Sequence, residues 1–113
     1  MKVLITIWHE DVAPRFDLAS EVLTADVDPE NGEVKGKKTL VLPAPSAEEL
    51  CRFILSEGIE TVICGGIENE YYQFLAWKNI KVIDSVIGSY EKALELLGGG
   101  ELEAGTIFKE REE

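Results

Sequence analysis

The chain has 113 residues, enough for one hydrophobic core and too few for two, so we expect a single domain over residues 1–113. Its 22 acidic residues outnumber 11 basic ones, giving a formal net charge of −11. Such a surface repels phosphate backbones, which argues against nucleic acid as a partner. The apolar run from Val3 to Trp8 is too short for a signal-peptide core or a membrane span. We therefore expect a cytoplasmic protein that makes no membrane contact, with Cys51 and Cys64 as free thiols.

The first half of the chain predicts three strands. The first covers residues 2–8 and is followed by an irregular loop through Asp17. The second covers residues 21–28 and enters a turn whose Asn31-Gly32 pair suits the left-handed conformations of a tight hairpin. The third covers residues 38–42. The lysines beside the turn are interpreted as a solvated strand edge; they are Lys35, Lys37 and Lys38.

Two helices are predicted from their end signals. Ser46 and Glu49 form a capping box that begins a helix running to about Glu57, with Gly58 as the stop. A last helix covers residues 89–97 and ends at three consecutive glycines. The tail after about residue 105 ends in charged residues, and we expect it to be flexible.

Residues 61–84 form the most informative stretch, because they predict a strand, a two-glycine turn, a helix and a second strand. The apolar run Thr61 to Cys64 is typical of a parallel strand with both faces covered. Gly65 and Gly66 then permit a positive φ, which we expect at one of them at least, and the close approach of another group. Such a turn places the first amides of the next helix beside a crevice.

Together these elements predict an α/β domain with a mixed sheet whose first, fourth and fifth strands are parallel. If the first strand neighbours the fourth, their carboxyl ends form a shared rim. That rim would collect the loop from His9 to Asp17, the Gly65-Gly66 turn and the loop after Asp84. Ligands of open α/β sheets favour this position.

Four segments carry a family resemblance; in order they are APRFDLA, VICGGI, IKVID and GSYEKALELLGGGEL. In sequence and spacing they resemble the dinitrogenase iron-molybdenum cofactor biosynthesis family, the small NifX/NifB-type domain, over nearly the whole chain. The resemblance implies a three-layer, ribonuclease H-like fold. Its five-stranded mixed sheet would have the order 3-2-1-4-5, with strand 2 antiparallel and helices on both faces.

The resemblance also implies a protein without catalytic turnover that binds or carries a metal-sulfur cluster or its precursor. The cargo would be an iron-sulfur or molybdenum-containing cluster, or another anionic ligand, and cluster-assembly proteins would be partners. The matched segments supply the candidate cluster contacts, which are Arg15, Phe16, Cys64, Gly65, Gly66 and Ile67.

Several of these residues have two interpretations. Cys64 is either a thiolate metal ligand or a small buried hydrophobe. His9, the only histidine, is either a metal ligand at the rim or a structural residue. The helix after the glycines begins with Glu68-Asn69-Glu70, whose carboxylates oppose an anionic cluster. Aromatic residues on the same helix are interpreted as core and as a candidate surface for a homodimer, with a monomer as the alternative; they are Tyr71, Tyr72, Phe74 and Trp77.

The sequence contains no CxxC pair, HExxH motif or nucleotide-binding glycine pattern. Three functions follow from the whole sequence. The first is a cluster carrier at the rim, which Arg15-Phe16 and Cys64-Gly65-Gly66 favour. The second is an interaction or regulatory module that keeps the fold without a cluster, which the acidic helix start favours. The third is a metal-dependent hydrolase, which would need several carboxylates converging at strand ends.

Overall fold

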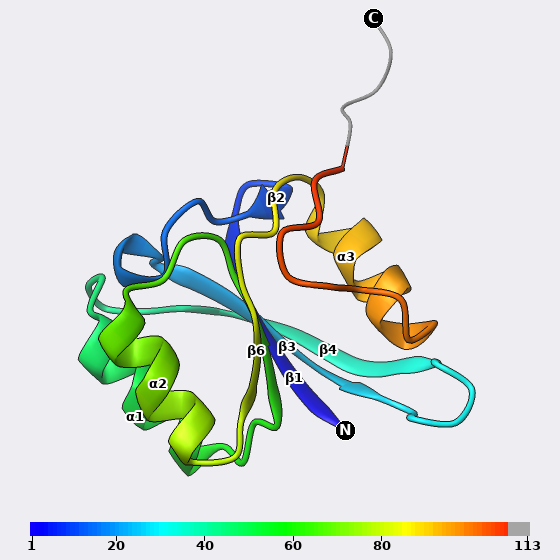
Figure 1. Ribbon diagram of the computed structural model, residues 1–113, viewed down its shortest axis with the longest axis horizontal. Coiled ribbons are helices and arrows are strands. Elements are labelled where there is room, and N and C mark those ends of the chain that lie inside the picture. Colours follow the sequence, from blue (N-terminus) through cyan, green and yellow to red (C-terminus); the bar gives the residue numbers. More distant parts are fainter. Residues whose placement is uncertain (109–113) are drawn as a thin grey trace, which may run out of the picture.

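The computed structural model describes residues 1–108, which form a sheet between two layers of helices (Figure 1). The elements in chain order are β1 (Lys2–Trp8), β2 (Asp11–Val12), the 3-10 helix η1 (Phe16–Leu18), β3 (Glu21–Val27), β4 (Val34–Val41), α1 (Ala47–Ser56), β5 (Thr61–Ile63), α2 (Asn69–Trp77), β6 (Lys81–Ile83) and α3 (Tyr90–Gly98). The predicted flexible tail lies largely outside the described residues. Its described part is hydrogen-bonded, because the Phe108 amide donates to the Ile87 carbonyl at 2.8 Å.

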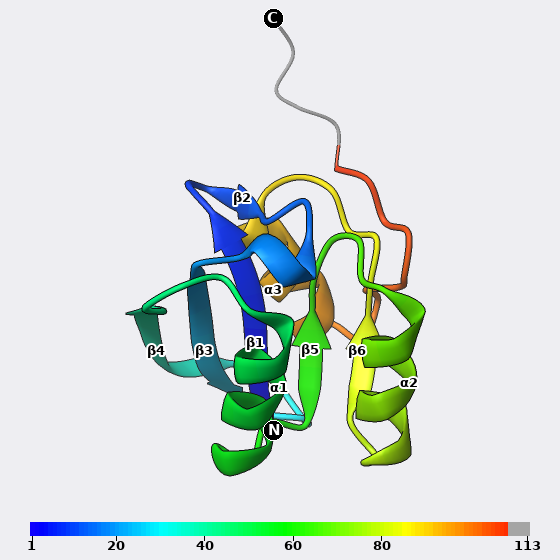
Figure 2. The same cartoon turned by 90° about the vertical axis from the view of Figure 1, so that its left-hand side faces the viewer.

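The sheet has the order β4-β3-β1-β5-β6, which Figure 2 shows from left to right. β1 pairs in parallel with β5, and β5 with β6, whereas β3 is antiparallel to both β1 and β4. The predicted strand order and directions are therefore confirmed. The predicted count of five strands is wrong, because β2 pairs with the end of β1 as a sixth. Two residues are too few to show an alternating pattern. The ribonuclease H-like class stays a prediction.

The third predicted strand begins four residues too late and ends one too late, since β4 covers Val34–Val41. β4 lies at the edge of the sheet, and five consecutive residues in it are exposed, so no apolar alternation marks its first half. Lys35, Lys37 and Lys38 are exposed on this strand, as the interpretation of a solvated edge requires. In the preceding turn Gly32 has a φ of 75°, whereas Asn31 is not left-handed.

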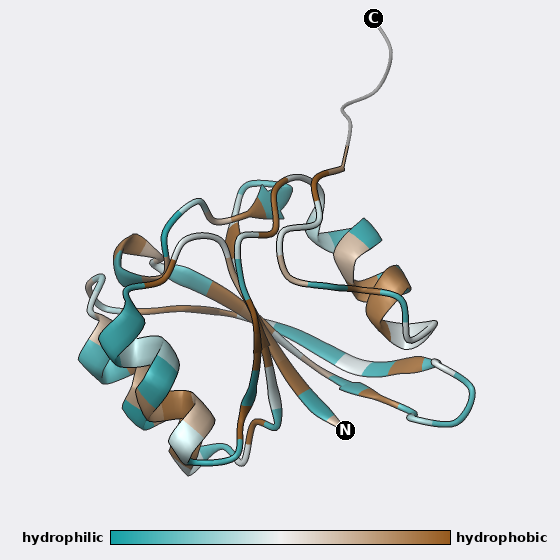
Figure 3. Ribbon diagram, in the orientation of Figure 1, coloured by the Kyte–Doolittle hydropathy of each residue, from teal (hydrophilic) through white to brown (hydrophobic). Residues whose placement is uncertain are grey.

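Two apolar clusters cover the two faces of the sheet. Side chains alternate along β1, so Val3, Ile5 and Ile7 pack on the side of α3, while Leu4 packs on the side of α1 and α2. Figure 2 shows α1 and α2 in front of the sheet and α3 behind it. Figure 3 shows apolar residues along the middle of the strands, between the two helix layers. Each fully buried aliphatic side chain contributes about 1.5–3 kcal/mol to folding.

The helices begin and end where the sequence signals predict. The Ser46 hydroxyl accepts a hydrogen bond from the Glu49 amide at 3.2 Å and caps α1. Gly58, with a φ of 69°, ends the same helix. Ser89 caps α3 in the same way, accepting from the Lys92 amide at 3.2 Å. No helix in the described part of the chain is long and apolar enough to cross a membrane.

Candidate functional site

A pocket of about 400 Å³ lies beyond the carboxyl ends of β1, β5 and β6. Three separate segments line it, and each follows one of these strands. The lining residues are Trp8, Asp11, Val12 and Pro14 from the first segment, Gly65 and Gly66 from the second, and Ser85, Val86, Ile87 and Gly88 from the third. The structure thus brings together the three loops that the sequence places at the shared rim.

Backbone hydrogen bonds fasten the three loops to one another. The Gly66 amide donates to the Pro14 carbonyl at 2.7 Å, and the Ser85 amide donates to the Gly65 carbonyl at 2.9 Å. The Val12 amide donates to the Gly88 carbonyl at 2.8 Å. Because each loop is bonded to another, the pocket is formed before any ligand arrives.

Position 65 requires a glycine because neighbouring backbone atoms leave no room for a Cβ atom, and not because its φ is positive. A Cβ atom at this position would lie 2.7 Å from the Pro14 carbonyl carbon and closer still to the carbonyl oxygens of Ala13 and Pro14. At Gly66 the nearest atom would be the Pro14 oxygen at 3.5 Å, an ordinary contact. Neither glycine has a positive φ, so the expectation of a left-handed residue here is wrong.

Left-handed backbone occurs instead at two non-glycine residues of the rim. His9, directly after β1, has a φ of 57°, and Ser85, two residues after β6, has a φ of 60°. Such conformations cost about 1–3 kcal/mol each and persist only where the surroundings impose them. The strain therefore lies in two of the loops that form the pocket.

The structure places the sequence-predicted site residues in three different positions. Gly65 and Gly66 line the pocket, and they are the only predicted residues that do so. His9 and Arg15 are exposed but do not line it. The His9 ring instead packs edge-on against Trp8, with ring centroids 4.5 Å apart. The remaining predicted residues belong to the apolar cluster under α1 and α2; they are Phe16, Cys64 and Ile67.

Arg15 is already paired within the chain. Its Nε and Nη2 atoms donate to the two carboxylate oxygens of Asp17 at 2.9 and 2.8 Å. The hydrogen bond with Asp17 is the largest cause that raises the pKa of Arg15, and the charge of Glu68 adds to it. A ligand anion would have to compete with two carboxylates for this guanidinium.

Cys64 lies in the apolar cluster beneath the pocket, with no exposed surface. Burial, with a smaller contribution from Asp84, raises the pKa of its thiol to about 12. The geometry therefore favours the interpretation of Cys64 as a small buried hydrophobe. Phe16 is buried in the same cluster, and Ile67 packs against it while partly exposed. Cys51 is also buried, and its pKa is raised to about 11.

The pocket offers mainly apolar walls and backbone. Of the residues that the structure describes, Asp11 is the only carboxylate that lines the pocket, and no lysine, arginine or histidine among them does so. Within residues 1–108, no group of three or more His, Cys, Asp or Glu side chains is placed to hold a metal ion. The arrangement is thus suited to holding a ligand by shape, apolar contact and backbone polar groups.

Sequence reasoning located the loops but missed most of the individual lining residues. Trp8 belongs to the end of an apolar strand, and nothing in its spacing distinguishes it from a core residue. The segment Ser85 to Gly88 carries no motif beyond its position after a strand. The usable signal was positional, since each segment directly follows a parallel strand.

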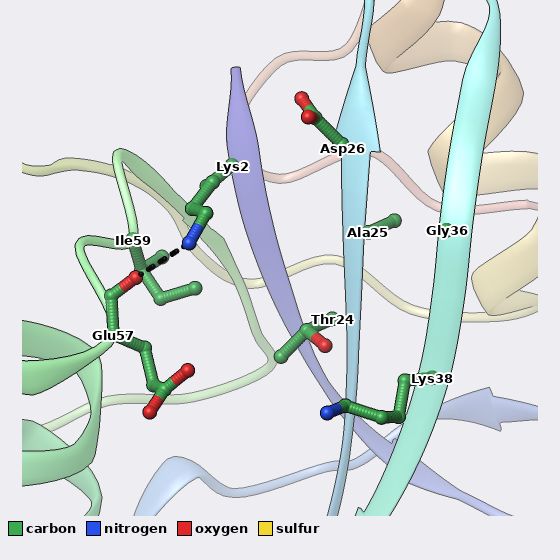
Figure 4. Close-up of a pocket in the computed structure, with 8 residues that line it drawn as sticks. All are labelled: Lys2, Thr24, Ala25, Asp26, Gly36, Lys38, Glu57 and Ile59. Atoms are coloured by element: carbon green, nitrogen blue, oxygen red, sulfur yellow. Dashed lines mark hydrogen bonds between the residues drawn. The ribbon is translucent and has the colours of Figure 1, made fainter.

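A second depression, of about 190 Å³, lies near the opposite end of β1 (Figure 4). Lys2 and Lys38 face it, together with Asp26 and Glu57, so its charges balance. The Lys2 ammonium donates to the Glu57 carbonyl at 3.2 Å. None of the sequence-predicted site residues lines this depression.

The structure is a three-layer α/β domain with a pocket at the strand ends, and solved structures share this fold. The protein PH0822 matches with a TM-score of 0.81 at 22% identity, over 92% of this chain and 94% of that one. A protein from Methanocaldococcus jannaschii, provisionally assigned as a dinitrogenase, matches with a TM-score of 0.74 at 25% identity, over 91% and 92%. A Thermotoga protein provisionally assigned as NifB matches with a TM-score of 0.66 at 20% identity, over 98% of both chains.

The chain belongs to the dinitrogenase iron-molybdenum cofactor family, whose family model matches residues 1–100. The family resemblance drawn from the sequence is therefore confirmed. The family relates the protein to the handling of the iron-molybdenum cofactor. No curated protein matches the chain.

Proposed function

We propose that this protein is a non-enzymatic carrier that holds a metal-sulfur cluster, or a precursor of one, in the rim pocket. The main observation that supports this proposal is the pocket of about 400 Å³ formed by three loops beyond the carboxyl ends of the parallel strands. Family membership over residues 1–100 supports this class of cargo. The carrier binds this cargo reversibly: it takes the cluster up from one protein and releases it to another.

The residues that line the pocket determine how such a cargo is held. Trp8 and Ile87, both largely exposed, offer apolar contact to a soft, weakly hydrated sulfide surface. No thiolate or imidazole lines the pocket, so the hold is non-covalent. Asp11 opposes a negative charge and keeps the affinity for an anionic cargo low.

A direct test is anaerobic reconstitution with tetrathiomolybdate, a small molybdenum-sulfur anion, followed by desalting and metal analysis. Trp8→Ala removes one wall of the pocket, and Trp77→Ala is its matched control, because Trp77 is exposed on α2 and does not line the pocket. We expect wild type and Trp77→Ala to retain molybdenum and Trp8→Ala to lose it. Equal retention by wild type and Trp8→Ala contradicts the proposal for this cargo.

Charge provides a second test with the same assay. Asp11→Asn removes the carboxylate in the pocket, and we expect it to increase the affinity for tetrathiomolybdate about tenfold. Glu57→Gln makes the same change of net charge at the far depression and should leave the affinity unchanged. An equal gain in both variants would indicate a general surface effect and not binding in the rim pocket.

The second candidate is an interaction module that keeps the fold without a cluster. Two observations favour it: Cys64 has no exposed surface, and Arg15 is paired with Asp17. If wild type retains no metal, this candidate becomes the better one. A metal-dependent hydrolase gains no support from the residues that the structure describes, since they form no converging group of carboxylates.

A further inference from the structure

Large apolar side chains are exposed around the mouth of the rim pocket. Trp8 and Ile87 are each 57% exposed and line the pocket, and Ile107 is 64% exposed. Ile107 lies beside Ile87, because the two residues form a parallel bridge. We call these three residues the apolar collar. Exposed apolar groups that gather around a pocket are typical of an interaction site.

Backbone contacts hold the apolar collar in place. The Ile87 amide donates to the Thr106 carbonyl at 3.0 Å, and the Phe108 amide donates to the Ile87 carbonyl at 2.8 Å. The Trp8 ring packs edge-on against the His9 ring. A surface fixed in this way loses little conformational entropy when a partner binds.

Charge decides which partner the collar fits. Among residues 1–108, Asp11 lines the pocket and no basic residue does, and the neighbouring Glu10 is exposed. Asp84 directly precedes the lining residue Ser85, and its carboxylate accepts a hydrogen bond from the Ser85 hydroxyl at 3.1 Å. A second copy of this chain would bring another net charge of −11 and be repelled. A partner with lysine or arginine at its contact surface would be attracted.

We propose that the apolar collar docks a partner protein that inserts an apolar side chain into the rim pocket and places lysine or arginine residues beside Glu10 and Asp11. This inference rests on the proposed function, because such a partner would be the protein that takes the cargo from the pocket. The inserted side chain occupies the cargo's position, so docking and loading compete.

Trp77→Phe leaves Trp8 as the only tryptophan, and its fluorescence then reports on the collar. The probes are three blocked peptides, in which four lysines flank a central leucine, four lysines flank a central alanine, or four glutamates flank a central leucine. We expect the lysine-leucine peptide to bind at least about tenfold more tightly than either of the others, and added salt to weaken its binding. Equal affinity for all three peptides, or no change in Trp8 emission, overturns the proposal.

Two further variants separate docking from cargo binding. Ile107→Ser alters the collar outside the pocket lining, and Val41→Ser is its control, since Val41 is 74% exposed on the edge strand β4 and does not line the pocket. We expect Ile107→Ser to weaken peptide binding severalfold while retaining tetrathiomolybdate like wild type. Peptide binding unchanged in Ile107→Ser overturns the docking proposal. Metal retention without peptide binding overturns docking alone, and peptide binding without metal retention overturns the carrier function alone.

Discussion

The sharpest prediction from the rim compares Gly65→Ala with Gly66→Ala, two identical substitutions at adjacent positions. A Cβ at Gly65 would meet backbone carbonyls of Ala13 and Pro14, which cannot rotate away as a side chain does. Moving Pro14 also strains its 2.7 Å hydrogen bond from the Gly66 amide. Overpacking of this kind costs about 1–3 kcal/mol, and we expect the upper half of that range.

Gly66 lacks this obstacle, because the nearest atom to its Cβ would lie at 3.5 Å and its φ is not positive. Gly66→Ala should therefore raise the free energy of unfolding, by less than about 1 kcal/mol, because alanine lowers the conformational entropy of the unfolded chain. The assay is urea unfolding followed by far-UV circular dichroism, with thermal melts in parallel. For a domain of this size a loss of about 2–3 kcal/mol lowers the melting temperature by roughly 10–20 °C.

Equal destabilisation by both substitutions would refute the close-packing argument, since only Gly65 faces the two carbonyls. A greater effect at Gly66 would refute it as well. A change in the slope of free energy against urea would show that the substitution altered the compactness of the native or unfolded state and not packing alone.

The buried Thr6 hydroxyl and the two buried cysteine thiols lead to further predictions about stability and reactivity. The Thr6 hydroxyl is fully buried without a hydrogen-bond partner among the described residues, so Thr6→Val should raise the free energy of unfolding by about 1 kcal/mol in the same urea assay. Because burial raises the pKa of Cys64 to about 12, the folded protein keeps this proton when the unfolded chain has lost it. Its contribution to stability is therefore complete below the pKa of an unfolded cysteine, about 8.5, and is lost as pH rises toward 12. Unfolding curves from pH 8 to 11 should show this decline, and Cys64→Ala should reduce it; Cys51, whose pKa is raised to about 11, supplies part of the remainder. A thiol reagent should label Cys51 and Cys64 only as fast as the protein opens; immediate labelling would contradict their burial.

The sequence predicted the topology well because its strongest signals mark the central elements. β1 and β5 are covered on both faces, and continuous apolar runs such as Leu4–Ile5 show this directly. The βαβ crossover then dictates parallel pairing of β5 and β6, and the hairpin at Gly32 dictates antiparallel pairing of β3 and β4. The first half of β4 was not predicted, because its exposed residues show no apolar alternation. β2 was not predicted, because two residues are too few to show a pattern.

The candidate site was predictable as a set of loops and not as a set of side chains. Position after a parallel strand is a topological property, so Gly65 and Gly66 could be placed at the rim before their neighbours were known. The close approach of Ala13 to Gly65 depends on a contact between residues more than fifty positions apart. The pairing of Arg15 with Asp17 depends on the shape of one loop, which no periodicity encodes.

The alternation of side chains along β5 explains why Cys64 and the pocket, one residue apart, are chemically separate. Val62 and Cys64 share the cluster under α1 and α2, so the sulfur lies in the core while the backbone at Gly65 turns to line the pocket. If a metal-sulfur cargo occupies this pocket, no thiolate bond to Cys64 has to break for it to leave. That property suits a carrier, whose cargo has to pass to another protein, and it is unsuited to a resident cofactor. The apolar collar around the same mouth would then place the receiving protein where the cargo is released.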